Sequence, residues 1–395
     1  MSINALRYRN ASIFAGSALV VPPTSVLALA SGWDTLVAGT AIGLMTTAAV
    51  LAAPLWGILD DRHGSRGLLA AAAGATFGSL LLFGCVLTGF KPAATITVLC
   101  IFGAASGGID PLVSAHIQRA GLMWALPRIR FFGALGWTLG LVVALILTAI
   151  GWGATVYLAA AMIFGSLTLA EIRAPAANQE TRRTRSRRPP IPRGLVVLVL
   201  VGLPVPISAY SYLIYSSSAL DAFGTAGQNV PFLTLIVLAS LELPVFALLG
   251  ARLKGWNLAV VYCAALLLLA ISWVPSALDL GSTTQALGLL LYTTAVAIWT
   301  IAQISAVRAF ARNTSASFVH TVISAGTKAL SAIAAGSGMG WLASSLGDRS
   351  APVFLLALSL IGLLLLGIAV IAFPSIRLAK IPTATDERKH HVYSN

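Results

Sequence analysis

Long apolar runs recur along the whole chain, and they limit its fold more than any other feature. Each run holds about 19 to 25 residues, which is the length that an α-helix needs to cross a bilayer. The twelve runs occupy residues 11–30, 36–57, 67–90, 94–118, 130–150, 153–171, 194–215, 230–251, 256–275, 283–307, 318–345 and 351–373. Inside a bilayer, helices satisfy their own backbone hydrogen bonds. The sequence therefore predicts an all-α integral membrane protein with twelve transmembrane helices.

Charged residues are scarce, and their placement also indicates a membrane protein. They make up 9% of the chain, against about 25% in soluble domains, and the mean hydropathy is +0.90. The net charge of +13 would suggest a nucleic-acid partner, but the basic residues lie mostly in short loops between apolar runs. On a twelve-span path, 22 of the 25 lysines and arginines fall on one side. We expect a multi-pass protein of the cytoplasmic membrane, surrounded by the lipid bilayer, with both termini in the cytoplasm and no nucleic-acid partner.

One long polar segment divides the chain into two halves. Residues 173–193 are rich in arginine and proline and have no apolar periodicity, so we interpret them as a cytoplasmic basic linker. The predicted parts are a six-helix bundle over 1–172, the linker, a second six-helix bundle over 194–376 and a cytoplasmic tail over 377–395. The linker can also contact anionic lipid headgroups, and a regulatory role for it is the less favoured alternative.

A charged turn joins the second and third apolar runs. It has the pattern G-x-L-x-D-R-x-G-x-R, formed by Gly57, Asp61, Arg62, Gly64 and Arg66. This pattern resembles the signature between the second and third helices of the major facilitator superfamily. The resemblance implies a fold of two pseudo-symmetric six-helix bundles. It also implies that the aspartate and arginine act as a conformational latch between the bundles on the cytoplasmic side. The alternative is an ordinary hydrophilic loop that happens to be charged.

The fifth run carries a second pattern. Arg130, Gly133 and Trp137 are spaced to share one face of a helix, and small residues on that face allow close helix approach. The run R-x-R-x-F-G-x-x-G-W-x-L resembles the fifth helix of oligosaccharide:proton symporters of the lactose permease type. By that resemblance, Arg130 and Trp137 occupy substrate-binding positions. The alternative is an anchoring arginine followed by a packing face.

Few ionisable residues lie inside the predicted spans, and such residues are costly in hydrocarbon unless paired. Lys328 on the eleventh run matches a lysine of the same symporters, and Glu242 is its proposed partner. Asp110 stands one turn before Ser114, which occupies the position of the acid that partners the fifth-helix arginine in those symporters. The tenth-helix histidine and glutamate that handle the proton there have no counterpart here. The predicted coupling set is therefore Asp110, Glu242, His320 and Lys328.

Polar side chains on two further runs complete the predicted binding site. Tyr210 and Tyr212 on the seventh run and Gln303 on the tenth are candidates for a sugar-sized cavity. The alternative for the tyrosines is an interface position. The sequence shows no metal cluster, nucleophile triad or phosphate loop, so we expect no enzyme activity, no cofactor and no metal.

The sequence favours a monomeric secondary active transporter for a small-molecule substrate. We expect it to move a small polar organic solute, with sugars favoured, by alternating access and in a proton-coupled way. The alternative within transport is a multidrug exporter of hydrophobic compounds, although the fifth run lacks the G-P-x-x-x-G-G pattern of such antiporters. A membrane-embedded enzyme or receptor without transport is the alternative from another class.

Overall fold

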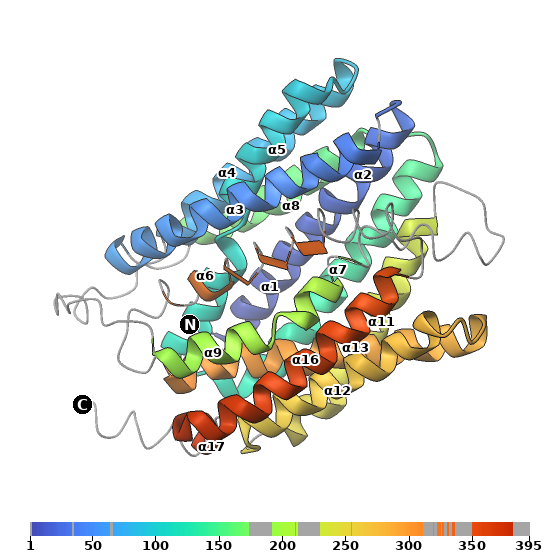
Figure 1. The fold of residues 1–395 in the computed structure, drawn as a ribbon. Coiled ribbons are helices and arrows are strands. Elements are labelled where there is room, and N and C mark those ends of the chain that lie inside the picture. Colours follow the sequence, from blue (N-terminus) through green and yellow to red (C-terminus); the bar gives the residue numbers. More distant parts are fainter. Residues whose placement is uncertain are drawn as a thin grey trace.

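The protein is helical throughout the part of the chain that the computed structural model describes. That part comprises residues 2–33, 35–63, 66–173, 192–209, 211, 230–253, 255–310, 319, 322–324, 326–327, 330–331, 334–335 and 350–381. Figure 1 shows long helices running roughly alongside one another, with shorter helices between them. The extended pairing in the described segments is a single bridge between Asn257 and Lys380.

Among the described residues, nine helices with defined bounds belong to the first half of the chain and six to the second. The first half contains α1 (Ile3–Ala18), α2 (Val21–Ala30), α3 (Thr35–His63), α4 (Arg66–Leu87), α5 (Pro92–Ser106), α6 (Ile109–Arg119), the 3-10 helix η1 (Met123–Ala125), α7 (Leu126–Ala149) and α8 (Thr155–Arg173). The second half contains α9 (Arg193–Val201), α11 (Val230–Arg252), α12 (Leu258–Ala277), α13 (Ser282–Phe310), α16 (Ser350–Ala372) and α17 (Pro374–Leu378).

The described helices lie at the positions of predicted spans, although some of their ends differ. Among the described residues, nine helical segments are long and apolar enough to cross a bilayer, and they fall at nine of the twelve predicted positions. The seventh and eighth positions hold the shorter apolar helices Arg193–Ala209 and Leu235–Leu248. The eleventh predicted span, 318–345, lies mostly outside the described residues. The predicted division into two bundles joined by a linker stays a prediction, because residues 174–191 are not described.

Two predicted boundaries are wrong, and buried charges explain both. The first helix begins at Ile3 rather than near residue 11, because Ser2 caps it and Arg9 is buried inside the molecule. The second span does not end at residue 57, since α3 continues through the charged residues to His63. Asp60 within this extension is fully buried. Most of the predicted charged turn between the second and third runs is therefore helix.

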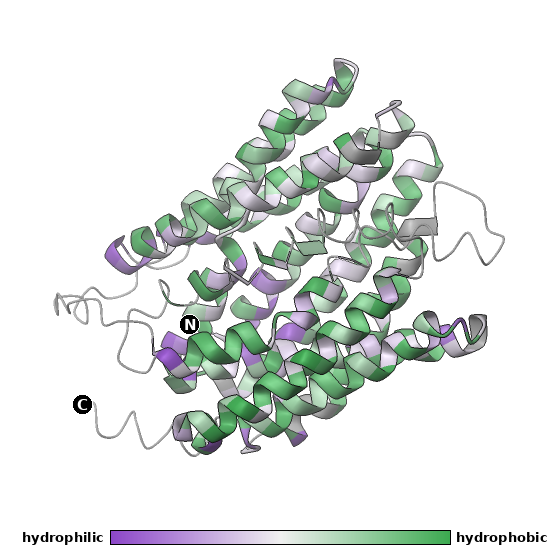
Figure 2. Ribbon diagram, viewed as in Figure 1, coloured by the Kyte–Doolittle hydropathy of each residue, from purple (hydrophilic) through white to green (hydrophobic). Residues whose placement is uncertain are grey.

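Apolar side chains cover both the inside and the outside of the molecule. Figure 2 shows hydrophobic colour along the whole length of most helices, with hydrophilic residues gathered mainly towards their ends. Large apolar residues such as Leu51, Met162 and Ile371 are exposed, Ile371 by 84%. In water such a surface would associate, whereas lipid tails solvate it well. The fold is therefore that of a multi-pass membrane protein.

Glycines allow α1 and α7 to pack closely along most of their length. A Cβ atom at Gly136 would lie 2.3 Å from the Ala11 carbonyl oxygen, and one at Gly140 would lie 2.6 Å from the Ala15 carbonyl oxygen. At the same interface the Asn10 amide donates to the Ile129 carbonyl oxygen at 2.9 Å. The small-residue face predicted on the fifth run thus serves helix packing against α1.

We expect Gly136→Leu to separate α1 from α7 and to lower the thermal stability of the purified protein markedly. The reason is that backbone atoms of Ala11 stand where the new side chain would go, so no rotamer change of a neighbour can make room. Gly84→Leu in α4 is the matched control, because nothing lies within 4 Å of its ideal Cβ. Thermal unfolding in detergent compares the two variants. Equal stability of both would contradict the close packing described here.

The last described residues form a clasp with the start of α12. The Gly255 N–H donates to the Ile381 carbonyl oxygen at 3.0 Å, and the Ile381 N–H donates to the Trp256 carbonyl oxygen at 2.9 Å. The Leu258 N–H donates to the Ala379 carbonyl oxygen at 2.9 Å. We call residues 255–258 and 377–381 the terminal clasp. Gly255 has a φ of +78°, a left-handed backbone conformation that suits glycine.

Candidate functional site: a central polar cavity

A cavity of about 340 Å³ lies between the two halves of the chain. From the first half, α1, α6 and α7 line it, and from the second half α11, α13 and the segments around residues 206–209 and 323–327. Most of the wall is apolar. Its charged and larger polar or aromatic members are Phe14, Asp110, Arg130, Trp137, Glu242, Phe246, Tyr292, Trp299 and Gln303.

Arg130 lies in α7 and is held by two residues of α6. Its guanidinium donates to the Asp110 carboxylate at 2.7 Å and to the Ser114 hydroxyl at 3.0 Å. The Phe14 ring of α1 covers the guanidinium at 5.6 Å from the ring centroid. Asp110, which lies one turn before Ser114, is therefore the acidic partner of Arg130. The sequence predicted this substitution, because Ser114 occupies the position at which the symporters have their acid. Only 6% of the Arg130 surface remains exposed.

Trp137 and Gln303 also reach the cavity. Trp137 lies two turns beyond Arg130 on α7, and its ring meets the edge of Phe14 at a centroid distance of 6.5 Å. Gln303 lies on α13 across the cavity, where its side-chain amide donates to the Thr327 hydroxyl at 3.0 Å. The structure thus brings Arg130, Trp137 and Gln303 to one cavity.

Glu242 of α11 is the acidic residue that the second half contributes to the cavity wall. It is half-buried, and it forms no hydrogen bond or ion pair with a residue that the structure describes. Among the described residues, the charged group that acts on it electrostatically is Arg130. Its predicted partner, Lys328, lies outside the described residues, as do His320, Tyr210, Tyr212 and Gly64. The pairing of Glu242 with Lys328 stays a prediction.

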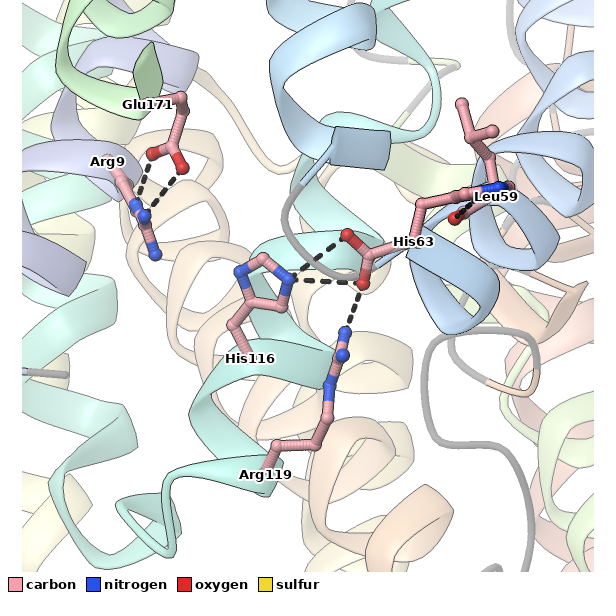
Figure 3. A network of polar contacts seen from close by, with 7 residues as sticks. Arg9, Leu59, His63, His116, Arg119 and Glu171 are labelled. Carbon is pink, nitrogen blue, oxygen red and sulfur yellow. Dashed lines mark hydrogen bonds and ion pairs between the residues drawn. The ribbon is translucent and has the colours of Figure 1, made fainter. Parts of the chain in front are cut away.

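A cluster of charged residues that sequence reasoning missed, buried except for Arg119, occupies one end of the first half (Figure 3). His116 lies with its Nε2 3.1 Å from the Asp60 carboxylate, and Arg119 donates to the same carboxylate. Arg9 of α1 forms two hydrogen bonds with Glu171 of α8, at 2.5 and 2.6 Å. We call these five residues the charge cluster. It joins α1, α3, α6 and α8.

The buried acid of α3 is Asp60, and the predicted latch acid Asp61 is only half-buried. Asp60 follows Ala53 and Gly57 at spacings of seven and three residues, so it falls on the buried face of the helix. That spacing was visible in the sequence. Gly67 at the start of α4 leaves room for it, because a Cβ there would lie 2.6 Å from the Asp60 Cβ.

The predicted latch residues are only partly placed by the structure. Gly57 is buried in α3, while Arg62 and Arg66 are exposed at the ends of α3 and α4. The ion pairs of Asp60 with His116 and Arg119 join helices of the first half. A latch between the halves through Asp61 and Arg62 stays a prediction.

No protein-family model matches the chain, and no curated protein matches it either. Solved structures do. The proton:xylose symporter XylE of E. coli, bound to 6-bromo-6-deoxy-D-glucose, aligns over 98% of both chains with a TM-score of 0.73 at 12% identity. The human organic anion transporter MFSD10 aligns over 92% of this chain and 98% of its own, with a TM-score of 0.67 at 17% identity. The chain has the major facilitator fold.

A third structure agrees with this assignment. The nucleoside transporter NupG aligns over 94% of this chain and 98% of its own, with a TM-score of 0.64 at 15% identity. The major facilitator fold accounts for the predicted spans that lie among the described residues. The cavity described above lies between helices of both halves of this fold. Identities this low establish the fold alone, so the roles of individual residues depend on the chemistry of the cavity.

Proposed function

We propose that the protein is a secondary active transporter that moves a small polar organic solute across the cytoplasmic membrane by alternating access. One observation carries the proposal: ionisable residues from both halves line a single cavity inside a membrane-spanning fold. Ionisable groups are costly at this depth, so their presence indicates a pathway for a polar solute. The similar solved structures are described as transporters of xylose, nucleosides and organic anions.

Within this function, Trp137 and Gln303 are the proposed solute-binding residues, with Arg130 beside them. An indole ring packs well against the apolar face of a sugar ring, and an amide binds hydroxyl groups. Tyr210 and Tyr212 remain proposed members of the same site. The resemblance to symporters of the lactose permease type makes a sugar the first solute to test. Export of hydrophobic compounds is the second candidate, favoured by the aromatic wall that Phe14, Phe246 and Trp299 provide.

The proposed coupling ion is the proton, carried by the set Asp110, Glu242, His320 and Lys328. The proposed topology places both termini in the cytoplasm, with bundles over 1–172 and 194–376, and the protein works as a monomer. The proposed latch around Asp61 and Arg62 would control the rate of cycling while leaving solute affinity largely unchanged.

Reconstitution in proteoliposomes tests the function. We expect uptake or release of a labelled solute from a panel of sugars and organic amines, stimulated by an imposed proton gradient. Trp137→Ala should reduce the flux by about tenfold, the equivalent of losing one aromatic contact. Trp152→Ala is the matched control, because Trp152 is exposed in the turn after α7, away from the cavity. Absence of flux for every probe, or equal flux in both variants, would contradict the proposal.

A further inference from the structure

Both terminal nitrogens of Arg130 bind protein partners. One terminal nitrogen donates to Asp110 and the other to Ser114. Its Nε is enclosed and has no partner in the described part of the chain. The Phe14 ring covers the guanidinium. An anionic solute would need the two-pronged donor face of an arginine, and that face is already occupied. Arg130 and Asp110 together add no net charge to the cavity.

Glu242 differs from Arg130 in this respect. Its carboxylate lines the same cavity and forms no hydrogen bond or ion pair with any residue in the described ranges. With Arg130 and Asp110 balanced, the described lining has a net charge of about −1 when all three groups are ionised. A carboxylate inside an apolar wall is unfavourable unless a partner satisfies it. A bound solute with a positive charge would supply that partner.

The other polar group across the cavity is also suited to a hydrogen-bond donor. The Gln303 amide nitrogen donates to Thr327, which leaves the amide oxygen as an acceptor. The indoles of Trp137 and Trp299 and the ring of Phe246 provide apolar wall around these acceptors. Aromatic faces attract cations and pack against apolar rings, but they do not attract anions.

We propose that Glu242 makes this cavity selective for solutes that carry a protonated amine on a small apolar or aromatic body. The ammonium group donates to the Glu242 carboxylate and to the Gln303 amide oxygen, and the apolar part packs against the aromatic wall. This inference rests on the proposed function, in which the cavity is the solute-binding site. If the inference holds, the favoured solute of the cavity is an organic cation and no longer a sugar.

Three probes with the same ring and chain length test the selectivity: 2-phenylethylammonium, 2-phenylethanol and phenylacetate. Their binding to the purified full-length protein is measured by isothermal titration calorimetry at neutral pH. We expect the ammonium probe to bind about tenfold or more tightly than the alcohol, and phenylacetate to bind most weakly. Glu242→Gln should remove this preference and leave binding of the alcohol nearly unchanged. Asp279→Asn, which removes a carboxylate in the turn after α12 and tolerates the φ of 55°, should behave like the native protein.

Preference for phenylacetate, or an ammonium preference that survives Glu242→Gln, would overturn the inference. Lys328→Gln provides a further test, because Lys328 is the predicted partner of Glu242. If the ammonium probe bound only after Lys328 was removed, the native cavity would not be cation-selective and the inference would fail. The flux assay separates the two proposals. Sugar flux without ammonium binding would refute the inference alone, whereas Glu242-dependent binding without flux of any probe would refute transport alone.

Discussion

Asp60→Ala is expected to reduce the free energy of unfolding by about 3–5 kcal/mol, the usual result of removing one partner from a buried charge pair. Asp60 is fully buried and accepts hydrogen bonds from His116 and Arg119. Its removal leaves the buried His116 beside the positive charges of Arg119 and Arg9 without the carboxylate that balances them. The buried His116 ring also loses the acceptor at its Nε2, and a polar group left unsatisfied in the interior is costly.

The neighbouring aspartate provides the control for this experiment. Asp61→Ala removes the same group from the next position of α3, where the side chain is only half-buried. We expect a much smaller loss of stability from it, measured by thermal unfolding in detergent and by the yield of monodisperse protein. If Asp61→Ala were the more damaging change, Asp61 would be the structural acid of this helix and the described geometry would be wrong.

The pair of Arg9 and Glu171 is expected to show strong coupling in a double-mutant cycle. The two side chains are almost completely buried, with 7% and 1% of their surfaces exposed, and two short hydrogen bonds join them. Arg9→Met alone or Glu171→Gln alone should cost about 3–5 kcal/mol, because each leaves an uncompensated buried charge. The double variant should cost much less than the sum, since apolar or neutral replacements need no partner.

Thermal unfolding of the native protein, both single variants and the double variant provides the coupling energy. Arg7→Met together with Glu171→Gln is a suitable comparison, because Arg7 lies two residues from Arg9 and contacts the Phe132 ring rather than Glu171. This second cycle should be close to additive. Additive losses for the pair of Arg9 and Glu171 would show that the two charges do not interact.

The overall fold could be predicted because it depends on properties that act locally along the chain. A run of apolar residues near bilayer length becomes a helix wherever it occurs, and no knowledge of its neighbours is needed. The assignment of helices at nine predicted positions follows from this alone. The ends of the helices were harder to predict. Arg9 and Asp60 look like loop residues in sequence, and only their partners on other helices allow them to be buried inside.

The cavity could be predicted in part, because Arg130 and Trp137 lie on one face of one helix and that spacing is visible in sequence. Contacts between distant segments were not visible. Arg9 and Glu171 are 162 positions apart, and nothing in either local sequence identifies the other as its partner. The charge of Arg130 also looked available to a solute until Asp110 and Ser114 were found to occupy its donors. Pairing of this kind decides which charges a cavity offers.

The terminal clasp has a consequence for how the second half can move. Backbone hydrogen bonds join residues 377–381, which follow α16, to residues 255–258 at the start of α12, and α12 and α16 also pack against each other. Backbone groups released from such pairing at a membrane surface would need new partners, so the clasp resists separation of the two helices. Any opening at this end of the molecule must therefore displace α12 and α16 together as one mechanical unit. The hinge then lies in the connections of this unit to the rest of the second half.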